Sequence, residues 1–231
     1  MTQGMLVPPA RRPARVVRMS DPSTPPRQRR PQAERTAETR GKLIQAAITC
    51  LHRTGYSATT ITTVAEEAGV SRGAMTHQFP AKTDLMLAVV EAVFEEDAVL
   101  YGRTISQMDP DVWLLELPQI MWEVMSRPAG IAVLEIMLAS RSDHELGEPL
   151  RALQSRIDLQ AHRWSEDRVR AAGLEPHPEA EAMHELYVAA VRGLALEATF
   201  MNNTADVQRS LKILSETMRQ LYPSLVPKPQ G

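Results

Sequence analysis

The chain has 231 residues, 43% of them hydrophobic and only 4% aromatic, with a net charge of −2 and a single cysteine. This length is enough for one large domain or two small ones with a sizeable core. The composition is typical of a soluble globular protein, and no apolar run is long enough to cross a bilayer. The lone Cys50 excludes an internal disulfide, and the start of the chain lacks the apolar segment of a signal peptide. We therefore expect a cytoplasmic protein.

The small net charge conceals an uneven distribution of charged side chains. Residues 1–33 carry seven arginines and one aspartate, whereas residues 83–231 carry thirteen basic and twenty-three acidic side chains. A basic front end on an acidic body suits a protein that docks one face on a polyanion such as nucleic acid. A solvated surface with a disordered tail would give the same distribution, so charge alone leaves both interpretations open.

The first part of the chain divides into an arm and three helices. Residues 1–33 contain seven prolines and almost no apolar periodicity, which predicts a disordered arm. Helices are then expected at about 34–54, 60–68 and 71–79. Thr60 and Ser71 are typical N-caps, and Gly55 and Gly69 favour the left-handed conformation that ends a helix. These start and stop signals are local, so they predict the boundaries directly.

The remainder of the chain also has only helical periodicity. Six further helices are expected, at about 82–104, 111–126, 128–142, 146–172, 179–203 and 207–221. Pro118 should kink the second of them. The sequence therefore predicts an all-α fold of about nine helices. Residues 34–82 would form one small domain, residues 83–222 a larger one and residues 223–231 a disordered tail.

The second and third helices have the spacing of a helix-turn-helix. Two helices that cross closely need a small residue where they touch and a glycine where the chain reverses. Ala65 and Gly69 meet these needs, and Met75 is the apolar anchor of the second helix. Ser71 would cap that helix and leave its free N–H groups facing a phosphate. An ordinary helical hairpin would have the same spacing, so the motif alone leaves this choice open.

Several motifs in order resemble one known family. They are the Ala-Ala pair of the first helix, the Gly-Tyr-x-x-Thr-Thr link, the Ala-Gly-Val-Ser turn and the His-x-Phe-Pro-x-Lys ending. Together they make the stretch from Thr39 to Val90 resemble the DNA-binding domain of the TetR (tetracycline-repressor) family of bacterial transcriptional regulators. The rest of the chain is similar to the family only in the number and length of its helices.

The resemblance implies a dimeric regulator, a repressor by family default, that binds a palindromic operator in double-stranded DNA on the nucleoid. Residues 71–79 would be the recognition helix in the major groove. The residues implied to contact DNA are Thr59, Thr60, Ser71, Arg72, Gly73, Ala74, Thr76, His77 and Lys82.

Three of these residues carry distinct expectations. Arg72 suits a bidentate pair with guanine, worth about 1–3 kcal/mol of discrimination, although a phosphate contact is an equal alternative. His77 would lie beside the base edges or pack against the first helix. Thr76 stands where the family usually has a phosphate-binding Tyr, so that contact is not assured in this chain.

The larger domain would hold the dimer interface and an effector site. Small residues at helical spacing allow close helix approach, so the eighth and last helices are expected to pair with a second copy. The interface residues expected are Ala182, Leu186, Ala190, Gly193, Glu197, Leu211, Leu214 and Met218. A small, apolar effector would bind among Met and aromatic side chains, and the lining residues expected are Trp113, Trp122, Met125, Met137, Trp164 and Tyr187. Ordinary core packing is the alternative for each of these residues.

The sequence offers no catalytic constellation. The "HELGE" stretch at His144 lacks the second His of a metalloprotease helix, and His177 and His184 are too widely spaced for a confident metal pair. We therefore expect no enzyme activity, no cofactor and no metal. A helical dimer that binds other proteins without DNA remains as the alternative function.

Overall fold

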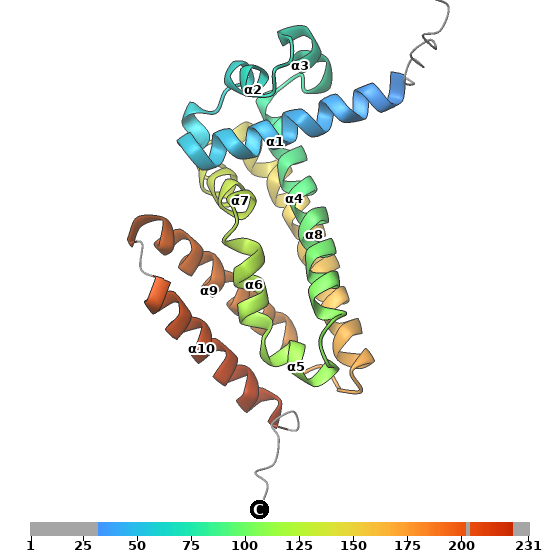
Figure 1. Ribbon diagram of the computed structural model, residues 1–231, viewed down its shortest axis with the longest axis vertical. Helices are drawn as coiled ribbons and strands as arrows, with labels where there is room; N and C mark the ends of the chain where they lie inside the picture. The colour runs from blue at the N-terminus through green and yellow to red at the C-terminus, as the bar shows by residue number, and fades with distance from the viewer. Residues whose placement is uncertain (1–31, 202–203, 224–231) are drawn as a thin grey trace, which may run out of the picture.

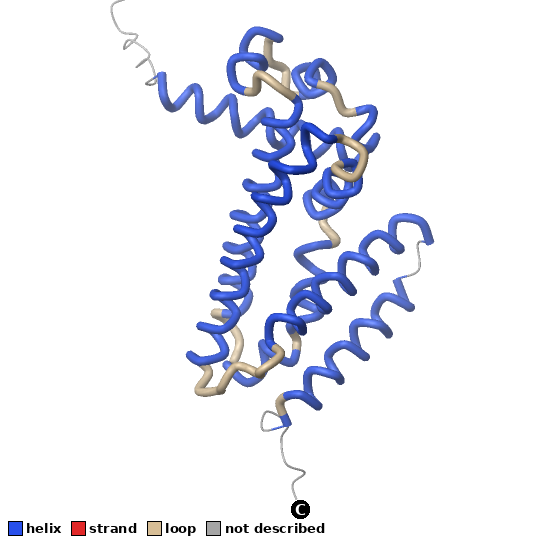
Figure 2. The backbone as a smooth tube through the Cα atoms, turned by 180° about the vertical axis from the view of Figure 1, so that it is seen from behind, coloured by secondary structure: helices blue, strands red, loops and turns tan. Residues whose placement is uncertain are grey.

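The structure is a computed structural model that describes residues 32–201 and 204–223. Ten helices make up its regular structure, and Figure 2 shows no strand among the described residues. The helices are α1 Gln32–Ala58, α2 Ile61–Glu67, α3 Arg72–Gln78, α4 Lys82–Ile105, α5 Pro110–Leu115, α6 Leu117–Met125, α7 Pro128–Ala139, α8 His144–Ala171, α9 Ala180–Met201 and α10 Thr204–Leu221. The all-α expectation is confirmed. The arm expected at residues 1–33 lies outside the described residues, except that Gln32 and Ala33 begin α1.

The helix boundaries of the small domain lie within one or two residues of the predicted ones, except that α1 continues to Ala58 across a kink at Gly55. Thr60 caps α2 in a capping box with Thr63, and Ser71 caps α3 by accepting a hydrogen bond from the Ala74 N–H. Gly55 and Gly69 both have positive φ, at 75° and 64°. These signals act within a few residues, and for that reason they are readable from the sequence.

Pro118 acts more strongly than expected. The predicted single kinked helix is two separate helices, because the backbone leaves helical geometry at Glu116 and restarts with Pro118 in the first turn of α6. Proline is tolerated there since the first helical N–H groups have no partner in any case. This break accounts for ten helices rather than nine.

The helices form a long bundle with the small domain at one end. Figure 1 shows α2 and α3 at the tip, α1 crossing beneath them, and α4 and α8 running side by side along the body. The first hydrophobic core joins α1, α2 and α3 to the upper parts of α4, α7 and α8. The second core lies between α5, α6, α9 and α10. The last helix, α10, lies beside α9 on the outer edge of the body in both views (Figures 1 and 2).

Candidate nucleic-acid interface and ligand cavity

The α2–α3 turn is held by a small buried core. Ala65, Met75 and Phe79 are at most 2% exposed, and the Val70 N–H donates to the Ala65 carbonyl over 3.0 Å. The Arg40 guanidinium from α1 lies 4.7 Å from the centre of the Phe79 ring. Because α3 has only seven residues, this packing rather than intrinsic helix propensity keeps it folded.

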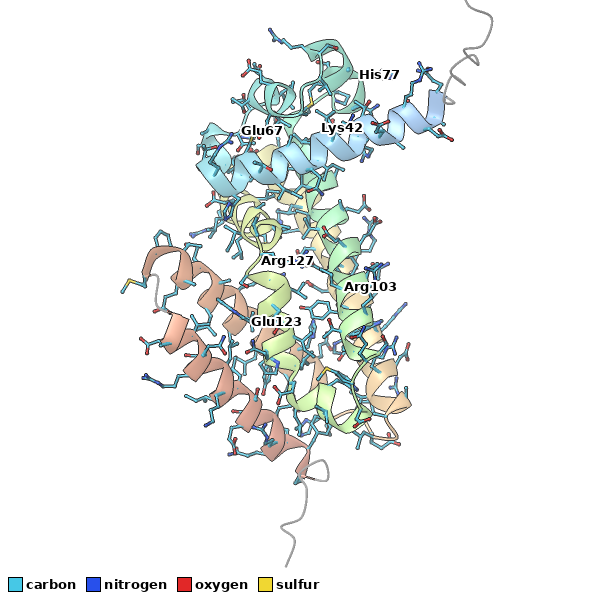
Figure 3. The ribbon with its side chains drawn as sticks, in the orientation of Figure 1. Lys42, Glu67, His77, Arg103, Glu123 and Arg127 are labelled. Atoms are coloured by element: carbon cyan, nitrogen blue, oxygen red, sulfur yellow. The ribbon has the colours of Figure 1, made fainter. Side chains whose placement is uncertain are left out.

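The outward face of α3 is polar and uncrowded. Arg72, Gly73, Thr76 and His77 are exposed, and Figure 3 shows His77 on this helix at the tip of the molecule. Since His77 is exposed, it does not pack into the core against α1. A Cβ added at Gly73 would meet only the Ser71 hydroxyl, at 4.0 Å, so intramolecular packing does not require a glycine there. The helix therefore presents a surface on which another backbone could lie closely.

Two threonines near this surface use their hydroxyl groups within the chain. Thr59 is fully buried and its hydroxyl donates to the Gly55 carbonyl over 2.8 Å. The expected DNA contact of Thr59 is therefore wrong for this conformation, because no part of the side chain reaches the surface. The Thr76 hydroxyl is exposed but donates to the Arg72 carbonyl over 3.0 Å, which occupies its hydrogen. Exposed Thr60 caps α2, and its phosphate contact stays a prediction.

Lys82 is less available than the sequence suggested. Its ammonium donates to the Tyr56 carbonyl over 2.8 Å and lies 3.6 Å from the centre of the Tyr56 ring. Partial burial lowers the pKa of Lys82. An ammonium has three N–H donors, so two remain after the bond to Tyr56. A phosphate contact through these two donors stays a prediction.

Tyr56 joins the small domain to the body, which sequence reasoning missed. Its backbone N–H donates to the Glu135 carboxylate of α7 over 3.0 Å. Its hydroxyl donates to the Asp143 carboxylate, the N-cap of α8, over 2.6 Å. The hydrogen bond from Tyr56 holds the pKa of Asp143 below its usual value. These contacts span more than seventy residues of sequence, so no local pattern indicates them.

A cavity of about 430 Å³ lies in the body between α4, α6, α7, α8 and α9. Most of its wall is apolar, and its larger apolar members are Val93, Phe94, Leu117, Met121, Met125, Leu134 and Trp164. Its size is within the ~300–1,000 Å³ usual for small-molecule sites.

Only two of the six residues expected at the effector site, Met125 and Trp164, line this cavity. Trp113 is 3% exposed in the second core, and Tyr187 lines a separate cavity of about 40 Å³. Trp122 packs against the second core, and Met137 against the first. These four assignments are wrong for the large cavity, because helical periodicity marks the inward face of a helix without distinguishing solid core from a hollow.

The polar residues of the cavity were also missed. Asp97 and Tyr101 come from α4, Asp158 from α8, and His184 and Arg192 from α9. Asp97 is paired with Arg127, which reaches toward α4 from the start of α7 (Figure 3). Burial raises the pKa of Asp97 to about 6, although Arg127 opposes this. The one available signal was Arg192, a lone charge within the apolar run "LYVAAVRGLAL".

The expected dimer interface divides between two environments. On α9, Ala182, Leu186, Gly193 and Glu197 are exposed and Ala190 is half-buried. On α10, Leu211 and Met218 are buried in the second core and Leu214 is half-buried. The expected contact of Leu211 and Met218 with a second copy is therefore wrong, because their side chains are already covered within the chain. Exposed Phe200 and Ile213 extend the apolar surface and were not expected.

No group of three or more His, Cys, Asp or Glu side chains within residues 32–201 and 204–223 is arranged to hold a metal ion. Cys50 is buried, and burial raises the pKa of its thiol. Among the same residues, no helix has the length and apolar character needed to span a membrane.

Comparison with known proteins places these features in one group. Residues 43–89 match the family model "Bacterial regulatory proteins, tetR family". The chain is 31% identical over 196 residues to the HTH-type transcriptional regulator CymR of Pseudomonas putida. The aligned region covers 84% of this chain and 96% of that protein.

Solved structures share the fold. A TetR transcription regulator from Haloarcula marismortui has a TM-score of 0.63 at 18% identity and covers 80% of this chain and 98% of its own. A structure described as a SmeT–triclosan complex has a TM-score of 0.59 at 23% identity and covers 84% of this chain and 99% of its own.

Proposed function

The chain belongs to the TetR family of bacterial transcriptional regulators and is a DNA-binding regulator, and from this premise we propose that it is a dimeric repressor. It leaves a palindromic operator when a small, largely apolar effector enters the cavity. Repression acts in the cytoplasm, on the nucleoid.

The observation that carries the proposal is that α4 connects the two sites. Its middle part, from Val90 to Tyr101, lines the cavity, and its first residue, Lys82, is bonded to Tyr56 in the small domain. A ligand that displaces α4 would therefore shift α3 and change the spacing of two recognition helices in a dimer. A coupling of about 1–3 kcal/mol changes operator affinity roughly five- to 150-fold. The bound triclosan in the SmeT structure supports a ligand role for such a cavity.

The DNA contact rests on the exposed face of α3. The Ser71 hydroxyl caps the helix at Ala74, and Arg72 follows at its first position. Phosphate contacts would fix the helix in the groove, while Arg72 is placed to read a base edge. The residues proposed to contact DNA are Thr60, Ser71, Arg72, Gly73, Ala74, Thr76, His77 and Lys82.

A gel-shift assay tests the DNA function with the DNA upstream of the protein's own reading frame and a scrambled duplex of equal length. We expect preference for the upstream DNA and affinity that falls steeply with salt. Arg72→Ala should lose this preference, whereas Arg163→Ala, an exposed position on α8, should keep it. Equal binding to both duplexes by the wild-type protein would instead favour a helical dimer that binds other proteins.

A further inference from the structure

The hydroxyl of Tyr101 is buried at the cavity without a hydrogen-bond partner among the described residues. The Tyr101 ring lies 6.3 Å from that of Trp164, centre to centre, which keeps the side chain against the cavity wall. Buried polar atoms are nearly always hydrogen-bonded in folded proteins, so such an orphan group indicates a missing partner.

Arg192 lines the same cavity and also has no hydrogen-bond or ion-pair partner among the described residues. Burial lowers the pKa of Arg192. The other charged groups of the wall do not neutralise it at close range. Asp97 is paired with Arg127. Asp158, an exposed residue of the same wall, opposes the lowering of the Arg192 pKa but forms no ion pair with Arg192. A half-buried cation of this kind is stabilised by an anion that brings hydrogen-bond acceptors.

Arg192 and Tyr101 line the same cavity and interact electrostatically. Arg192 lowers the pKa of Tyr101, against the larger raising effects of burial and of Asp97, so the guanidinium and the phenol lie within electrostatic reach of each other. A guanidinium offers a planar pair of N–H donors that matches a carboxylate, and the phenol adds a third donor. His184, on the same wall, has a pKa lowered mainly by burial, so its imidazole does not supply a second positive charge at neutral pH.

On the basis of the proposed function, we infer that the effector is an organic monocarboxylate. Its acid group is held by Arg192 and Tyr101, and its apolar body lies against Phe94, Met121 and Trp164. A cationic ligand would meet the repulsion of Arg192. Of the two carboxylates in the wall, Asp97 is occupied by Arg127, and Asp158 is exposed and accepts a hydrogen bond from Gln154. A neutral ligand would leave the guanidinium uncompensated. A doubly charged phosphate would find one cation and a mostly apolar wall.

The test uses the purified full chain without DNA at neutral pH, where carboxylates are ionised. The probes are naphthalene carboxylate, biphenyl carboxylate, phenylbutyrate and decanoate, each beside its uncharged primary amide. Binding is measured by calorimetry and by Trp fluorescence, to which Trp164 contributes. We expect at least one acid to bind on the order of tenfold or more tightly than its amide.

Two cavity variants and one control complete the test. Arg192→Met should remove the preference for the acid while leaving amide binding in place, and Tyr101→Phe should weaken acid binding several-fold. Arg163→Met, which removes an equal charge outside the cavity, should change neither value. Equal binding of acids and amides, preference for amides, no binding of any acid, or a preference that survives Arg192→Met would each overturn the inference. Because no DNA is present, these outcomes are separate from failure of operator binding.

Discussion

The hydroxyl of Tyr56 donates a 2.6 Å hydrogen bond to the carboxylate of Asp143, which caps α8. The carbonyl of the same tyrosine accepts from Lys82 at the start of α4, and its N–H donates to Glu135 of α7. One residue of the small domain is thereby bonded to all three of the body helices that pack beneath it. Movement of α4 or α8 around an occupied cavity would reach the DNA-binding helices through this residue.

The Tyr56–Asp143 pair should contribute measurably to stability. We expect Tyr56→Phe to lower the free energy of unfolding by about 1 kcal/mol. This is the typical net value for a hydrogen bond and lies below the ~1.5–3 kcal/mol of one to a charged group, because the pair is only half-buried. Asp143→Asn keeps an N-cap for Leu146 and serves as the matched partner variant. Urea unfolding of both single variants and of the double variant should give a non-additive cycle. Simple additivity would show that the two groups do not interact in solution.

The same pair predicts a pH dependence with a definite sign. The hydrogen bond from Tyr56 holds the folded-state pKa of Asp143 below its usual 3.8. The group therefore contributes stability that is fully present above pH 3.8 and is lost as the pH falls through the lower folded-state pKa. In Tyr56→Phe this pKa should move up toward its usual value. Urea midpoints of the variant and the wild type should then converge as the pH falls through this range, and a constant difference would contradict the assignment.

Ser71 allows the fold and the DNA contact of α3 to be separated. Ser71→Ala removes the hydroxyl that accepts from the Ala74 N–H and should cost about 0.5–2 kcal/mol of stability. Ser71→Asp should restore the cap and the stability, but its negative charge should repel phosphate and weaken operator binding. Thermal unfolding and gel shifts on both variants check this. Tight operator binding by Ser71→Asp would place the DNA backbone away from this helix terminus.

The exposed face of α9 should mediate dimerisation. Gly193 is exposed and a Cβ added there would meet no atom within 4 Å, so Gly193→Arg should leave the protomer folded but produce monomers that no longer bind operator. Gly102→Arg on α4, where space is equally open, is the control and should remain dimeric. Sedimentation velocity measures the outcome, and dimers of unchanged stability in Gly193→Arg would refute the α9 interface.

Leu211 tests the other half of the interface expectation. It is 2% exposed within the second core, so Leu211→Ala should lower the free energy of unfolding by about 2–5 kcal/mol through transfer and cavity effects. Leu186→Ala, which truncates a leucine that is 63% exposed, should change protomer stability little and weaken the dimer instead. The comparison is made by chemical denaturation at several protein concentrations. Equal effects of the two substitutions on protomer stability would contradict the placement of Leu211.

The sequence alone determined the elements whose causes are local. Thr60 and Ser71 cap their helices, and Gly69 ends α2, because a cap or a positive φ depends on a few adjacent residues. The ordered motifs around them were sufficient to indicate the family. The one local signal with an underestimated effect was Pro118, which restarts a helix instead of bending it.

The tertiary structure decided everything that depends on which face of a helix meets which neighbour. Trp113 and Trp164 were both expected at the effector site, yet one fills a core and the other lines a cavity. The same holds for Leu211, buried within the chain, and Leu186, exposed on α9. Periodicity shows that a helix has an inward face, but only packing of helices from distant parts of the chain decides whether that face meets side chains, a hollow or solvent.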